Sequence, residues 1–118
     1  MKYLFCLLLV ICSLLTKAQS PGLVNPDPQK QTFIVEASCG QCNFDLSGKG
    51  CELAIRMDGK AYFVTGTDID DHGDAHAHDG FCESIRTAEV QGEVVGDKFN
   101  VSFFRLQKVG QNKNPEKQ

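Results

Sequence analysis

The chain has 118 residues, and its 12 basic side chains against 15 acidic ones give a net charge of −3 at pH 7. This length predicts one domain, and the acidic balance argues against nucleic acid or an anionic membrane surface as a partner. Six cysteines are many for so short a chain. In an exported chain with a small core, paired cysteines first indicate disulfides.

The first 18 residues have the features of a secretory signal peptide. A basic start at Lys2 leads into an apolar run from Leu4 to Leu15, and the small residue Ala18 ends the segment. The apolar run is too short to span a bilayer as a helix. We therefore expect residues 1–18 to be removed and the mature chain to be periplasmic or extracellular, without a transmembrane segment.

Removal of residues 1–18 leaves 10 basic and 15 acidic side chains, a charge of −5, because Lys2 and Lys17 are lost. Residues 19–30 hold three of the four prolines and predict an extended linker. Residues 31–108 are the predicted folded domain, and residues 109–118 are a polar, flexible tail.

The folded domain opens with strands. Residues Thr32 to Ala37 predict the first strand, and Cys51 to Met57 and Lys60 to Val64 predict a hairpin around Asp58-Gly59. An Asp-Gly pair favours such a turn because both central residues need positive φ. In this register apolar partners face each other: Leu53 with Val64, and Ile55 with Tyr62.

A second hairpin is predicted from Glu89 to Val95 and from Lys98 to Leu106, with its turn at Gly96-Asp97. Pairing across this turn puts Val90 and Val94 on one face with Phe99, Val101 and Phe103. The adjacent Phe103-Phe104 breaks the alternation and predicts a bulge.

One short helix is predicted between the hairpins, because Phe81, Ile85 and Ala88 recur at helical spacing and Asp79 or Gly80 can cap it. The resulting order is β-β-β-α-β-β. This order is typical of a mainly β, five-stranded, OB-like barrel with one short helix.

The most distinctive stretch is DIDDHGDAHAHDGFC, residues 68–82, which holds five aspartates and all three histidines. Its spacing resembles an EF-hand loop, but a histidine stands at position 5 and an aspartate at position 12. Imidazole favours zinc or copper over calcium. The predicted metal ligands are His72, Asp74 and His76, followed by Asp70, His78 and Cys82.

Two other interpretations of this stretch stay open. Gly73 and Gly80 can turn a solvated loop in which aspartates cap backbone donors. Alternatively, His72 and a neighbouring aspartate can act in acid/base chemistry, although no nucleophile motif accompanies them.

The cysteines Cys39, Cys42, Cys51 and Cys82 remain after residues 1–18 are removed. A C-x-x-C pair such as Cys39 and Cys42 is redox-active, half of a zinc site, or structural. The residues after it read as a loop, and no second C-x-x-C follows. We therefore predict two structural disulfides among the four, with all three connectivities open. A free Cys82 would instead be a candidate ligand.

The string EASCGQCNFDLSGKGCELAIRMDGKAYFVTGTDIDDHGDAHAHDGFC, followed by IRTAEVQGEV, resembles a family of small exported bacterial proteins of unknown function. The resemblance covers nearly all of the predicted folded part. It implies that Cys39, Cys42, Cys51, the run from Asp70 to His76, and Cys82 belong together as one unit. It implies no activity.

These patterns predict an exported, non-enzymatic domain that binds a divalent transition metal, zinc first and copper next, through the loop of residues 68–82. The first alternative is a disulfide-stapled, metal-free module that binds an envelope protein or a glycan. The second is a thiol oxidoreductase that uses Cys39 and Cys42.

Overall fold

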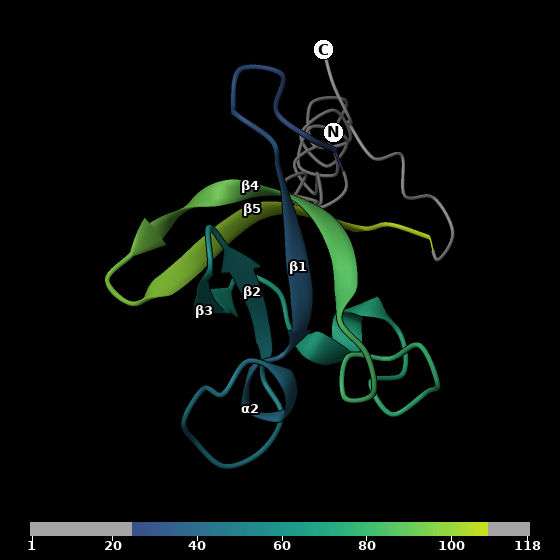
Figure 1. Ribbon diagram of the computed structural model, residues 1–118. Coiled ribbons are helices and arrows are strands. Elements are labelled where there is room, and N and C mark those ends of the chain that lie inside the picture. Colours follow the sequence, from purple (N-terminus) through teal and green to yellow (C-terminus); the bar gives the residue numbers. More distant parts are fainter. Residues whose placement is uncertain (1–24, 109–118) are drawn as a thin grey trace, which may run out of the picture.

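Five strands close into a barrel in the computed structural model, which describes residues 25–108 (Figure 1). The strands are β1 Phe33–Cys39, β2 Leu53–Met57, β3 Lys60–Thr65, β4 Arg86–Val95 and β5 Lys98–Leu106. Around the barrel they follow the order β1-β2-β3-β5-β4, and β4 returns to pair with β1. The predicted mainly β, five-stranded barrel is confirmed.

The predicted signal peptide, residues 19–24 of the predicted linker and the predicted tail lie outside the described residues. Within residues 25–108, no helix has the length and apolar character needed to cross a membrane.

Both predicted hairpins are present. Asp58 and Gly59 have φ values of 52° and 80°, as the tight turn between β2 and β3 requires, and Ile55 pairs with Tyr62 as expected. Between β4 and β5, Val95 pairs with Lys98 across a two-residue turn.

The predicted bulge is present, one residue earlier than expected. Gly92 pairs with Val101 but Gln91 pairs with Phe103, so Ser102 is the extra residue. As a result Val90 lies opposite Phe104, not on the predicted face with Phe103. Gly92 is needed here because a Cβ atom would collide with the carbonyl oxygen of Asn100.

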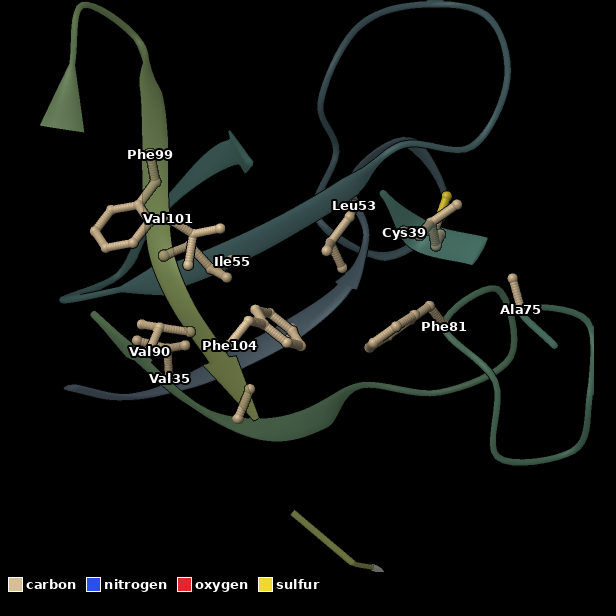
Figure 2. Close-up of a cluster of buried hydrophobic side chains, with 13 residues drawn as sticks. Val35, Cys39, Leu53, Ile55, Ala75, Phe81, Val90, Phe99, Val101 and Phe104 are labelled. Carbon is tan, nitrogen blue, oxygen red and sulfur yellow. The ribbon is translucent and has the colours of Figure 1, made fainter. Parts of the chain in front are cut away.

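The apolar core fills the barrel and extends past its end. Val35, Ile55, Val90 and Phe99 lie inside the barrel, and Phe81 from the connection between β3 and β4 continues the core toward Cys39 (Figure 2). The connection between β3 and β4 is therefore part of the fold, because it contributes buried side chains to the core.

The predicted helix over residues 81–88 is wrong. Residues 81–83 form a turn and β4 begins at Arg86, because the backbone there pairs with β1, with Val35 opposite Ala88. Phe81 and Ala88 are buried as expected, but Ile85 is 43% exposed. The helical segments of the described chain are α2, Gly40–Asn43, and the 3-10 turn η2, Ile69–His72.

The end of the predicted linker is attached to the barrel by a buried side chain. Gln91 is 1% exposed. Its side-chain amide donates to the carbonyl oxygens of Asp27 and Lys30 and to the hydroxyl of Thr32, and its side-chain oxygen accepts from the Asp27 N–H at 2.8 Å. One side chain thus ties residues 27–32 to β4.

Replacing Gln91 with leucine is expected to lower the free energy of unfolding by about 1–3 kcal/mol, because buried hydrogen bonds are lost. It should also speed tryptic cleavage after Lys30. Urea denaturation and timed proteolysis measure the two effects. Gln31→Leu, at an exposed neighbour, is the matched control, and equal behaviour of the two variants would contradict this role for Gln91.

Candidate metal centre

Four cysteines meet at one end of the barrel. Cys39 ends β1, Cys42 lies in α2, Cys51 precedes β2, and Cys82 lies in the turn before β4. Antiparallel pairing of β1 with both β2 and β4 brings these segments together, with Cys39 opposite Leu53 and Ala37 opposite Arg86. All four sulfur atoms lie within 4.8 Å of one another.

The C-x-x-C segment forms one helical turn, and the residues after it, 44–50, form the loop that the sequence predicts. Cys39 caps α2, and its sulfur accepts a hydrogen bond from the Cys42 N–H at 3.3 Å. Gly40 fits here because a Cβ atom would lie 2.8 Å from the Phe63 ring and 3.0 Å from Ala54. The Gly40 N–H donates to the Glu52 carbonyl at 2.8 Å, which anchors the turn to the segment that carries Cys51.

A buried polar network holds Cys82 beside the C-x-x-C turn. The fully buried Ser38 hydroxyl lies 2.8 Å from the Phe81 carbonyl oxygen and 2.9 Å from that of Ser84. The Asn43 amide donates to the Ser38 hydroxyl and to the Phe81 carbonyl, and the Cys39 N–H donates to the same carbonyl at 3.0 Å. The end of β1 and the turn at residues 81–84 are thus joined directly.

The four thiols form two close pairs. The sulfur atoms of Cys39 and Cys42 are 2.6 Å apart, those of Cys51 and Cys82 are 2.8 Å apart, and the Cys42 to Cys51 distance is 3.9 Å. Cys39 is buried, Cys51 and Cys82 are partly buried, and Cys42 is exposed. The four cysteines are free thiols in the structure, so the predicted disulfides stay a prediction.

The thiols differ in acidity. Burial alone would raise the pKa of Cys39, but hydrogen bonds from the Cys42 and Cys51 thiols lower it below its usual value. The hydrogen bond to Cys39, followed by burial, raises the pKa of Cys42 to about 11. Burial and hydrogen bonds to its sulfur neighbours also raise the pKa of Cys51. Cys39 is therefore more acidic than Cys42 and Cys51.

The His72 ring packs against Phe81 and Phe104 of the core. Its Nε2 atom is 2.9 Å from the Thr67 hydroxyl, and its ring lies 4.3 Å from the Phe104 ring. Burial lowers the pKa of His72, and the nearby Asp71 only partly opposes this. Asp71 in turn accepts hydrogen bonds from the Asp68 N–H and from Thr67.

The other predicted loop ligands lie at the surface. Asp74 accepts a hydrogen bond from the His76 N–H at 2.9 Å, and Asp79 forms an ion pair with Arg86 at 3.7 Å. Asp70, His76 and His78 are exposed. Within residues 25–108, the potential ligand atoms that lie close enough to share an ion are those of the four cysteines, and only Cys82 belongs to both sets. Metal binding by the histidines stays a prediction.

A family described as a family of unknown function, DUF6370, matches residues 33–107. The chain belongs to this family. The DUF6370 match begins at the first residue of β1 and ends one residue after β5, so it includes the whole barrel and all four cysteines. The predicted membership of a family of unknown function is therefore confirmed, while the export and bacterial source of that family stay predictions. Neither the curated proteins nor the solved structures contain a match to the chain.

The lowered pKa of His72 predicts a pH dependence of stability. As the pH falls below about 6.5, the unfolded chain binds a proton before the folded chain does, so stability is lost until the folded pKa is reached. The slope for one group cannot exceed about 1.4 kcal/mol per pH unit. Urea denaturation between pH 7.5 and 5 should show a smaller loss for His72→Gln than for the unmodified protein.

His78→Gln is the control, because His78 is exposed. The control variant should keep the full pH dependence. A His72→Gln protein that loses as much stability on acidification as the unmodified chain would refute the assignment.

Proposed function

We propose that this domain is an exported, non-catalytic protein that binds a transition metal through the sulfur atoms of Cys39, Cys42, Cys51 and Cys82. Zinc is the first candidate and copper is the next. The observation that carries the proposal is the convergence of four thiols, from four segments of the chain, within 4.8 Å.

The spacing of the sulfur atoms is close to that of a tetrahedral site. Zinc–sulfur bonds of about 2.3 Å place the sulfur atoms of a tetrahedron about 3.8 Å apart. The Cys42 to Cys51 distance of 3.9 Å is already near this value, and the two closer pairs need to separate by about 1 Å. Small side-chain rotations thus suffice to form the site.

The donor set favours a thiophilic metal. Four sulfur donors suit zinc or monovalent copper and do not suit calcium or magnesium. The N–H of Cys42, which donates to the sulfur of Cys39, stabilises the negative charge on that ligand. A bound cation would stabilise the thiolate forms of Cys42 and Cys51 against the burial and hydrogen bonds that raise their pKa values, so metal binding releases protons.

The exposure of the thiols supports a non-catalytic role. A thiol oxidoreductase needs an accessible thiolate of low pKa. In this cluster the thiol of lowered pKa, Cys39, is fully buried, while the exposed Cys42 has a pKa of about 11. The reactive and the accessible sulfur atoms are therefore different ones.

A bound metal would act as a cross-link. It would join the end of β1, the segment before β2 and the turn before β4, three places that are far apart in the sequence. The ligands meet only in the folded chain, so the binding free energy adds to the free energy of folding. Such a contribution matters for a barrel of this size, whose core is small.

The proposal of export rests on the basic start and apolar run of residues 1–18. Outside the cytoplasm, free thiols are oxidised unless they are bound to a metal. A bound metal would therefore protect the four thiols from oxidation in such a compartment.

Residues 19–118, purified under reducing conditions with zinc and then dialysed, should contain about one zinc ion per chain. Chelation should lower the melting temperature, and Cys51→Ser should lose the metal. Elemental analysis and thermal denaturation measure both effects. Substitution with cobalt should give the absorption bands of a tetrahedral tetrathiolate site.

The double variant His76→Ala/His78→Ala is the matched control and should keep its metal. If this variant lost its metal and Cys51→Ser kept it, the metal would bind to the histidine loop and not to the cysteines. Absence of metal from every reduced preparation would favour the metal-free binding module instead.

Ser38→Ala should weaken zinc binding by about tenfold, because it loosens the turn that presents Cys82 without removing any ligand. Ser47→Ala, at an exposed position, serves as the control. Competition with a chromogenic chelator measures the affinity, and equal affinities of the two variants would show that the network does not position the site.

A further inference from the structure

The two close sulfur pairs are also placed to form disulfides. Their separations of 2.6 Å and 2.8 Å lie between the bond length of a disulfide, about 2.05 Å, and the edge of a zinc tetrathiolate tetrahedron, about 3.8 Å. To form a disulfide each pair has to close by roughly 0.6–0.8 Å, and to form the tetrahedron it has to open by about 1 Å. The third measured separation, 3.9 Å between Cys42 and Cys51, favours the tetrahedron alone.

Building on the proposed metal site, we infer that the cluster is a redox switch. A disulfide oxidant converts the metal tetrathiolate into two disulfides, Cys39–Cys42 and Cys51–Cys82, and releases the metal. The pairing follows from the geometry and selects one of the three connectivities that the sequence left open.

The exposed Cys42 is the sulfur that an oxidant reaches first. As a metal ligand Cys42 is a thiolate, although its pKa as a free thiol is raised. This thiolate attacks one sulfur of the oxidant's disulfide and releases one oxidant thiolate, which leaves a mixed disulfide at Cys42. The Cys39 thiolate, 2.6 Å away, then attacks the Cys42 sulfur and releases the second oxidant thiolate. Two electrons pass from the cysteine pair to the oxidant.

The same two steps at Cys51 and Cys82 use a second molecule of oxidant. The metal leaves as a cation because the sulfur atoms of a disulfide no longer carry the charge of thiolate ligands. The two disulfides differ in what they join. Cys39–Cys42 closes only a local turn, whereas Cys51–Cys82 links the segment before β2 to the turn before β4. The oxidised barrel end therefore keeps a cross-link after the metal has left.

Trypsin provides a direct test of the pairing, because the cluster divides among three tryptic peptides. Residues 31–49 contain Cys39 and Cys42, residues 50–56 contain Cys51, and residues 61–86 contain Cys82. The zinc-loaded protein is treated with oxidised glutathione, free thiols are blocked in acid, and the digest is analysed by mass spectrometry. Released zinc is followed with a chromogenic chelator.

The expected result is an internal disulfide in peptide 31–49 and a second disulfide joining peptides 50–56 and 61–86, with zinc released in parallel. Either of the other connectivities joins all three peptides and would overturn the inference. Zinc that stays bound after both disulfides form would overturn the coupling between oxidation and release. A reduced protein that holds no zinc would instead refute the proposed function, while the peptide map would still decide the pairing.

Two single variants test the order of attack. In Cys39→Ser the second step is blocked, so a glutathione adduct should accumulate on Cys42. In Cys42→Ser the adduct on the buried Cys39 should form roughly tenfold more slowly, because reaction follows exposure. Circular dichroism verifies that both variants are folded, and a faster adduct on Cys39 would contradict the order.

Discussion

The parallel pairing of β3 with β5 is the constraint from which the candidate site follows. Two parallel strands cannot be joined by a tight turn, so the chain must cross from one end of the barrel to the other between them. Residues 66–85 stay at the end of the barrel where β1 and β3 finish and β4 begins, and β4 itself spans the barrel beside β1. Barrel closure therefore carries Cys82 to the C-x-x-C turn.

The crossing segment is held by its own polar side chains as well as by apolar contacts. Phe81 and Ala75 are buried in the core, and the backbone N–H of Cys82 donates to the Ala75 carbonyl at 2.9 Å. Asp71, Asp74 and Asp79 each accept a hydrogen bond from within the segment or form an ion pair close to it. Several polar side chains of residues 68–82 thus stabilise the conformation of this loop. The loop in turn holds the Cys82 thiol beside the other three cysteines.

Metal binding and disulfide formation compete for the same four atoms. Four thiols at one end of a small barrel provide a cross-link in either state, because both states join the segment before β2 to the turn before β4. The states differ in charge and in reactivity, since only thiolates hold a cation. In this proposal the domain keeps a cross-link in both redox environments and releases its metal when the environment oxidises the cluster.

The sequence by itself determined the local features. The Asp58-Gly59 turn and the Ile55 to Tyr62 pairing follow from turn chemistry and alternating burial, which neighbouring residues decide. The barrel was inferred from the order of the predicted elements alone. The helix expected around Ile85 does not form, because pairing with β1 outweighs a helical spacing of apolar side chains.

Sequence reasoning also set aside a four-cysteine metal site, because Cys51 and Cys82 do not form a second C-x-x-C motif. Only barrel closure decided that these two sulfur atoms, 31 residues apart, lie beside Cys39 and Cys42. Such proximity depends on long-range strand pairing, which no local pattern records.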